Sequence, residues 1–180
     1  MANAPLVEFR SKSAPYSVLS SLLYAQSALG GNNLPVLGGE NSNVVFFRIY
    51  NNFAGSLGIA TMDNVYLTVF DDADPNSHTA AKSPVSQSWV RVYETGFGEN
   101  SIVPGLYTGW VGEDTAIGKS GVDQYVPEYG SDGSVTPRIR AGTDANGVGF
   151  IEFATYLEVP DGAGFASYSF AVSIVYDWTS

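Results

Sequence analysis

Cysteine is absent from the 180-residue chain, and histidine occurs once, at position 78. Without cysteine, disulfide bonds and thiolate metal sites are excluded. One histidine is too few for a zinc site built on nitrogen ligands. The Gly-x-Ser-x-Gly elbow expected of many serine hydrolases does not occur either, and we interpret His78 as a solvated loop residue. Several classes of catalytic and metal site are thereby removed.

Basic side chains are also scarce, since eight Lys and Arg stand against eighteen Asp and Glu, a net charge of −10. Nucleic acids and anionic membranes are recognised through a basic surface, so neither is an expected partner. The charge is uneven: residues 1–60 carry a net +1 and residues 61–180 a net −11. This asymmetry favours docking of the N-terminal part of one copy, residues 1–60, on the acidic remainder of another copy.

Long hydrophobic runs are missing as well. Residues 13–39 carry no charge, but Ser, Gln, Asn, Pro and paired glycines interrupt their apolar residues, which excludes a membrane-spanning helix here. No Lys-rich start precedes an apolar run, so we expect no signal peptide. The chain is therefore expected to be a soluble protein made in a cytosol.

What the chain does have is alternation of large apolar side chains with smaller or polar ones, the pattern of half-buried β-strands. Five segments show it, namely residues 45–50, 65–70, 86–94, 150–159 and 165–178. Two further strands are expected near residues 5–10 and 134–141. Turn-rich links without regular helices between these strands predict an all-β fold, an antiparallel β-sandwich of the jelly-roll or Ig-like kind. Residues 15–180 are predicted to form this single domain.

The region before the first clear strand is predicted to hold an extended arm and a short helix. Residues 1–14 form the arm, and we expect its apolar side chains to add a strand to the sheet edge of a neighbour. The arm residues are Leu6, Val7 and Phe9. Apolar residues at helical spacing follow between a capping Ser13 and Gly30-Gly31. These are Val18, Leu22, Ala25 and Leu29. A pair of short strands is the alternative.

Residues 95–149 hold twelve of the twenty glycines and are predicted to form a long irregular loop insertion. Because long loops inside a domain commonly carry function, we expect specific contacts here. The candidate binding surface consists of Tyr107, Trp110, Asp123, Gln124, Tyr125 and Tyr129. Their rings suit sugars, and burial against the domain or a neighbouring subunit is the competing interpretation.

Acidic residues offer two further sites, both of which the sequence disfavours. Asp72, Asp74 and Asn76 alternate as calcium ligands do, but Ser77 stands where the calcium loop needs glycine. We interpret this segment as an acidic turn and expect no bound metal or cofactor. A hydrolase with a carboxylate pair is the second alternative, against the interpretation that these side chains keep a loop solvated. The carboxylates concerned are Glu113, Asp114, Asp123 and Glu128.

Two stretches give the chain a resemblance to a known class of proteins. They are "FFRIYNNFAGSLGIATMDNVYLTVFDD" and "YLEVPDGAGFASYSFAVSIVYDW", two strand pairs with Gly-rich links. In this style the chain resembles accessory structural proteins of tailed-bacteriophage virions, the β-sandwiches of head decoration, fibre base or tail tip. The resemblance implies a non-enzymatic virion protein that self-associates or docks on other virion proteins, without a cofactor. A carbohydrate-binding or adhesion module is the alternative, and the resemblance transfers no site residue.

Overall fold

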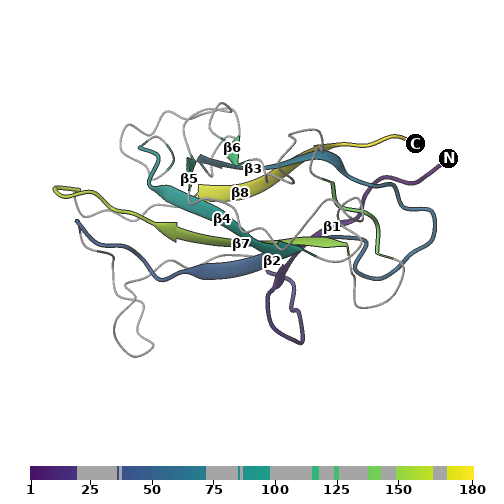
Figure 1. Ribbon diagram of the computed structural model, residues 1–180, viewed down its shortest axis with the longest axis horizontal. Coiled ribbons are helices and arrows are strands. Elements are labelled where there is room, and N and C mark those ends of the chain that lie inside the picture. Colours follow the sequence, from purple (N-terminus) through teal and green to yellow (C-terminus); the bar gives the residue numbers. More distant parts are fainter. Residues whose placement is uncertain are drawn as a thin grey trace.

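Segments with alternating side chains form strands in the computed structural model, and the eight strands it describes lie in two antiparallel sheets (Figure 1). The structure describes residues 1–19, 36, 38–71, 85, 87–97, 115–117, 124–125, 138–142, 149–163 and 170–180. The elements described within these ranges are all strands. None of the described residues belongs to a helix of the length and hydropathy that crossing a membrane takes. The predicted all-β class and antiparallel pairing are confirmed.

The larger sheet has five strands in the order β1-β2-β7-β4-β5. They are β1 (Val7–Ser11), β2 (Val45–Asn51), β7 (Phe150–Leu157), β4 (Val90–Phe97) and β5 (Thr115–Ile117). The central pair β2 and β7 joins segments far apart in the sequence, with Arg48 opposite Glu152. On its other side β7 pairs with β4, whose register shifts between Glu94 and Gly96.

The smaller sheet has three strands in the order β6-β3-β8. They are β6 (Gln124–Tyr125), β3 (Asp63–Asp71) and β8 (Phe170–Asp177). The stretch near the C-terminus thus forms the strand that its alternation predicts, paired along β3.

Both sheets contribute side chains to one hydrophobic core. Phe47 and Ile49 of β2 are completely buried, as is Leu67 of β3. From β8, Val172 and Ile174 pack against this cluster and are partly buried. Burial of such side chains is the main favourable term in folding, so the pairing of the two inner faces defines the fold.

Residues 13–19 do not form the start of the predicted helix. The Tyr16 amide donates to the carbonyl of Ser13 at 2.9 Å, which makes a turn, and Val18 forms an antiparallel bridge with Arg10. The Leu19 amide then donates to the Phe9 carbonyl at 2.8 Å. Pairing with β1 and packing of Leu19 on the core outweigh helical spacing here. The rest of the predicted helix lies outside the described residues.

The predicted N-terminal arm contains a strand of the protein's own sheet. β1 confirms the strand expected near residues 5–10, and the ring of Phe9 stacks on Phe47 at 5.9 Å. Val7 also packs against the core, whereas Leu6 is exposed. Contact of this arm with a neighbouring molecule stays a prediction.

Residues 95–149 are more regular than predicted where they are described. β4 continues to Phe97, and β5 and β6 both lie within this region. At three and two residues, β5 and β6 are too short to show alternation, so the sequence gives no signal for them. Of the strand expected near residues 134–141, the structure describes residues 138–141, where Ile139 forms a bridge with Met62.

Candidate functional site

Most of the predicted site residues lie outside the residues that the structure describes. This applies to Tyr107, Trp110, Asp123 and Tyr129 of the predicted binding surface, and to Asp72, Asp74 and Asn76. Gln124 and Tyr125 form β6, where they are opposite Thr68 and Leu67 of β3. No group of three or more His, Asp or Glu side chains suited to a metal ion occurs in the described part of the chain.

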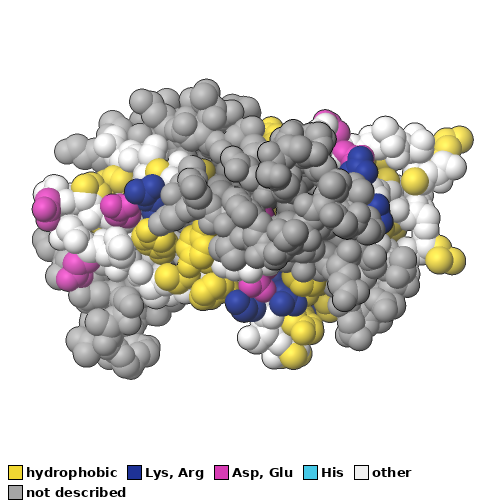
Figure 2. Space-filling view, in the orientation of Figure 1, with side chains coloured by type: hydrophobic (Ala, Val, Ile, Leu, Met, Phe, Trp, Pro, Cys, Tyr) yellow, Lys and Arg dark blue, Asp and Glu magenta, His cyan; other side chains and the backbone are white. Residues whose placement is uncertain are grey.

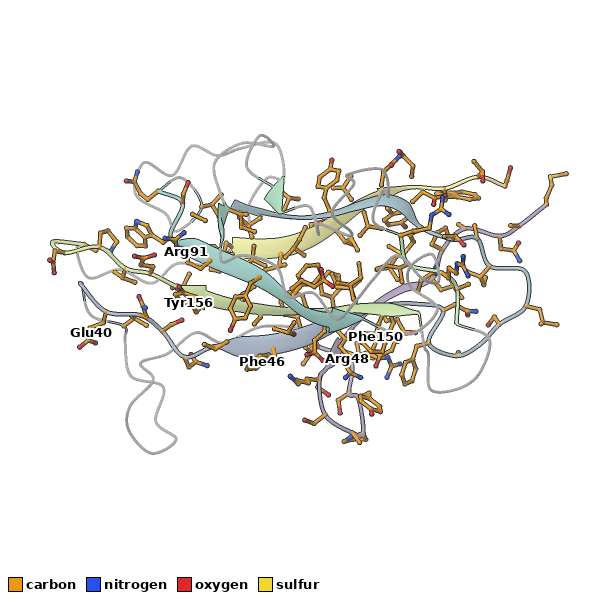
Figure 3. The ribbon with its side chains drawn as sticks, in the orientation of Figure 1. Glu40, Phe46, Arg48, Arg91, Phe150 and Tyr156 are labelled. Atoms are coloured by element: carbon orange, nitrogen blue, oxygen red, sulfur yellow. The ribbon has the colours of Figure 1, made fainter. Side chains whose placement is uncertain are left out.

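The outer face of the larger sheet is the best-defined candidate surface. Because strand side chains alternate, burial of Phe47 and Ile49 in the core turns Phe46, Arg48 and Tyr50 to this outer side, where Phe46 is exposed and Tyr50 is covered by its neighbours. Neighbouring strands and turns add further basic and aromatic residues there, and we name this surface the cation–aromatic face. It comprises Arg10, Lys12, Tyr16, Phe46, Arg48, Tyr50, Phe53, Arg91, Tyr93, Phe150 and Tyr156 together with Glu8, Glu152 and Glu158. Figure 3 labels Phe46 and Arg48 of β2, Arg91 of β4, and Phe150 and Tyr156 of β7, spread along this sheet.

Arg48 lies within a ring of four aromatic side chains. Its guanidinium carbon is 4.2 Å from the ring centre of Phe150 and 5.5 Å from that of Tyr16. Tyr50 contacts Phe150 at 5.1 Å and Phe53 at 4.9 Å, and Phe53 contacts Tyr16 at 6.4 Å. Cation–π and edge-to-face contacts of this kind each add stability beyond buried area. The cluster is therefore a rigid support, already occupied by the protein's own cation.

Glu152 anchors this cluster by accepting bonds from three side chains. Arg48 Nε donates at 2.8 Å, Lys12 Nζ lies at 2.9 Å, and Thr95 Oγ1 donates at 2.7 Å. Burial by itself raises the pKa of Glu152, but these three partners outweigh it and hold the pKa below its ordinary value. The carboxylate is thus ionised at neutral pH, which suits a structural anchor and not a general acid.

Arg10 and Lys12 extend the same pattern towards the edge of the sheet. The Arg10 guanidinium lies 3.6 Å from the ring centre of Phe53 and pairs with Glu8. Arg10 Nη1 also donates to the Tyr16 carbonyl at 2.6 Å. This bond helps to hold Tyr16 at a φ of 54°, a left-handed conformation uncommon for residues with a side chain.

An exposed part of the face begins beside Lys12. The Lys12 ammonium is 4.5 Å from the ring centre of Phe46, and its side chain is 45% exposed. Phe46 itself is 39% exposed, a high value for a phenylalanine on a strand. Basic charge and accessible aromatic surface therefore occur together at this point.

The exposed part continues across β7 and β4. Phe46 and Tyr93 both lie opposite the small Ala154, in one row across three strands. Arg91 is opposite Tyr156 and forms an ion pair with Glu158 at 2.6 Å. Figure 2 shows a band of hydrophobic side chains on the molecule beside Lys or Arg and Asp or Glu side chains.

The charge of the cation–aromatic face differs from that of the whole chain. Four of the eight basic residues belong to it and only three of the eighteen acidic residues, which gives a net +1. The remainder of the chain, with four basic and fifteen acidic residues, has a net −11. This contrast matches the charge asymmetry that the sequence shows between its first sixty residues and the rest.

A buried carboxyl group lies on the opposite, core-facing side of the same sheet. Glu94 is completely buried, and burial raises its pKa to about 9. Glu94 follows Val90 and Val92 at the same two-residue spacing. The alternation of β4 therefore predicts that its side chain faces the core. Neither Glu94 nor Arg48 was predicted as a site residue, although Arg48 lies in the outward row between Phe46 and Tyr50.

No protein-family model matches the sequence, and a search of curated proteins finds no match.

Proposed function

We propose that this chain is a non-enzymatic structural protein that assembles through its cation–aromatic face. The face docks on an acidic surface, either of the next copy of the chain or of a neighbouring protein in a lattice. The setting suggested by the sequence resemblance is the virion of a tailed bacteriophage, as a capsid decoration or a tail or fibre accessory. The proposed architecture is the β-sandwich that this class of protein uses, of the jelly-roll or Ig-like kind.

The observation that carries this proposal is exposed aromatic surface beside basic charge on an acidic chain. Phe46 is 39% exposed next to Lys12, and Arg48 behind them is fixed by Glu152 and by aromatic rings. Aromatic and Arg residues are enriched in protein interfaces, and complementary charge increases the rate and the specificity of association. A rigid surface also loses little side-chain entropy when a partner binds.

Assembly between unlike surfaces is a head-to-tail contact. The basic face of one copy then meets the acidic remainder of another, and the contact repeats as a ring or an open filament. Such a contact is weakened by salt, because screening acts on the charges at its rim. The proposed function is consistent with Glu152 acting as an ionised anchor and not as an acid–base group.

Substitution of the exposed residues tests this proposal. We expect Phe46→Ser and Lys12→Glu each to weaken self-association at least about tenfold in about 50 mM NaCl, since each removes apolar contact or reverses charge. Val175→Ser is the matched control, because Val175 is 38% exposed but lies on β8 in the smaller sheet. Sedimentation velocity measures the change, and circular dichroism checks that each variant is folded. Equal association of Phe46→Ser, Lys12→Glu and the parent protein contradicts the proposal.

Carbohydrate binding is the second candidate function. It is favoured by the row of Phe46, Ala154 and Tyr93, where a small residue separates two rings on one sheet face. Rings at such spacing suit the apolar faces of sugars, and the Arg91–Glu158 pair offers hydrogen-bonding groups nearby. The predicted glycan surface around Trp110 is a separate location on the chain.

A glycan array with three proteins separates these functions. If the chain binds carbohydrate through the cation–aromatic face, Phe46→Ala loses glycan binding while Trp110→Ala keeps it. If the surface of residues 95–149 binds carbohydrate instead, Trp110→Ala loses glycan binding and Phe46→Ala keeps it. If the unmodified protein binds no glycan on the array, carbohydrate binding is contradicted as a function of this chain.

A further inference from the structure

One end of the molecule is free of charged side chains over two adjoining segments. Residues 2–7 and 49–62 contain no Asp, Glu, Lys or Arg, although the chain has 26 such residues. The two segments are joined: the Asn3 amide donates to the Gly58 carbonyl at 2.6 Å, and the Ala60 amide donates to the Asn3 carbonyl at 2.9 Å. We name the surface made by residues 2–6 and 54–60 the uncharged end. It lies at the right-hand extremity in Figure 1, and Figure 2 shows it as mostly white with hydrophobic tips.

Buried asparagine side chains hold the uncharged end rigid from inside. Asn51 Nδ2 donates to the carbonyls of Ala60 at 2.8 Å and Ile139 at 3.0 Å, and Asn51 Oδ1 accepts from the Leu6 amide at 3.3 Å. Asn51 is completely buried, so these bonds are shielded from water. They fix the N-terminal segment and the loop between β2 and β3 as one unit.

Asn52 braces the tip of the same loop. Its φ is 62°, a left-handed conformation that asparagine tolerates better than most residues. Its side chain accepts from the Ser56 amide at 2.9 Å and donates to the carbonyls of Ser56 at 2.8 Å and Gly142 at 2.7 Å. Gly55 and Gly58 also have positive φ values, 73° each. The loop is therefore ordered before any partner binds.

This rigid loop presents an apolar side chain directly to solvent. Leu57 is 93% exposed, and Leu6, in the adjoining segment, is 44% exposed. Single exposed leucines are common, but this one is held on a braced and uncharged support. A contact made by such a loop loses little conformational entropy and buries no charged side chain.

We propose that the uncharged end docks on the same end of a second copy, with Leu57 as the anchor on both sides. Two copies of a chain with net charge −10 repel, and among the described surfaces this end brings no side-chain charges together. A like-with-like contact is closed by a twofold axis, unlike the head-to-tail contact of the cation–aromatic face. The inference deepens the proposed assembly role and rests on it, because two kinds of contact link subunits into a lattice.

A lipid surface is the competing occupant, and charge argues against it. The uncharged end has no Lys or Arg of its own to attract anionic headgroups, and the chain as a whole is acidic. Two basic side chains near its border are already paired, since Arg10, on the ring of Phe53, pairs with Glu8, and Arg138 pairs with Asp63 at 2.7 Å. A membrane is therefore an outcome to be tested and not the proposal.

Single-cysteine cross-linking tests the contact directly, because the chain has no cysteine of its own. Ser56 is exposed next to Leu57, so we expect Ser56→Cys to form a disulfide-linked dimer in mild oxidant at low micromolar concentration. Ser13→Cys, exposed in the turn after β1, is the control and stays largely monomeric. In about 500 mM NaCl, where repulsion is screened, we expect the unmodified protein to form dimers that Leu57→Ser weakens at least about tenfold.

Several results overturn the inference. They are a monomer at every concentration in high salt, a dimer that Leu57→Ser leaves unchanged, and equal cross-linking of Ser56→Cys and Ser13→Cys. The protein could instead bind phosphatidylcholine or phosphatidylglycerol vesicles, with Leu57→Ser abolishing this binding. That result would make a lipid surface, and not a second copy, the occupant of the uncharged end. Phe46→Ser separates this inference from the proposed function, since it leaves the Leu57-dependent dimer intact and removes the salt-sensitive association alone.

Discussion

The carboxyl group of Glu94 lies on the core-facing side of β4, in the row that begins with Val90 and Val92. Complete burial disfavours the charged form and raises the pKa to about 9. Below that pH the folded protein keeps the group protonated, whereas the unfolded chain releases the proton above about pH 4.5. The folded state therefore binds one more proton between these two values, and its stability decreases as pH rises through them.

Replacement of Glu94 by glutamine is expected to remove this loss of stability. At about pH 7 the parent protein bears a proton-uptake cost of on the order of 3 kcal/mol that Glu94→Gln lacks. We predict that the variant is more stable by up to that amount, and that its advantage grows from about pH 5 to about pH 9. Urea denaturation at these pH values measures the difference.

Glu158→Gln is the control for this experiment, because the Glu158 side chain is half exposed. It is expected to change the free energy of unfolding by less than about 1 kcal/mol at each pH. If Glu94→Gln and the parent protein keep a constant difference in stability across the range, Glu94 is not buried as a neutral acid.

Among the elements, the start of β7 depends on a close approach of two backbone segments. A Cβ atom at Gly149 would overlap the carbonyl oxygen of Arg140, while the Gly149 carbonyl accepts from the Asn51 amide at 2.9 Å. Gly142 donates to the Asn51 carbonyl from the other segment. Only glycine at position 149 lets these three segments meet.

We predict that Gly149→Ala destabilises the protein by about 2–4 kcal/mol, since the backbone of one segment must move and its hydrogen bonds must stretch. Gly96→Ala is the matched control within β4, where an added Cβ meets nothing within 4 Å. That variant should stay within about 1 kcal/mol of the parent protein. Thermal unfolding measures both, and equal melting temperatures would show that the approach at Gly149 is not needed.

The longer strands are the part of the fold that the sequence predicts well. Alternation identifies β2, β3, β7 and β8 because each is seven to nine residues long and has one apolar row that faces the core, buried in β2, β3 and β7 and partly buried in β8. The helix beginning after Ser13 was wrong at residues 13–19, where an edge of β1 supplies competing hydrogen bonds. These partners, Phe9 and Arg10, lie eight to ten residues earlier in the chain, beyond the spacing of three or four residues that predicts a helix.

Much less of the candidate site is visible in the sequence. The charge contrast between the first sixty residues and the rest points to the region of Arg48, but not to its aromatic ring. That ring unites Tyr16, Phe53 and Phe150, which come from different segments of the chain. Likewise, the alternation of β2 does not show that Asn51 and Asn52 brace a loop. Both clusters arise from strand register and turn geometry, which single-sequence patterns do not specify.

For the whole molecule, the two proposed surfaces respond to salt in opposite ways. The cation–aromatic face uses charge attraction towards an acidic flank and weakens as salt screens it. The uncharged end joins two acidic molecules and strengthens when salt reduces their repulsion. Together they describe a subunit that forms extended assemblies at low ionic strength and twofold pairs at high ionic strength.

The mass in solution of the unmodified protein tests this account most directly. By sedimentation velocity across a concentration series, we predict assemblies larger than dimers in about 50 mM NaCl and dimers in about 500 mM NaCl, each dimer twice the 19.1 kDa chain. A mass of 19.1 kDa at both salt concentrations and at every protein concentration would contradict the claim that this protein assembles through its own surfaces.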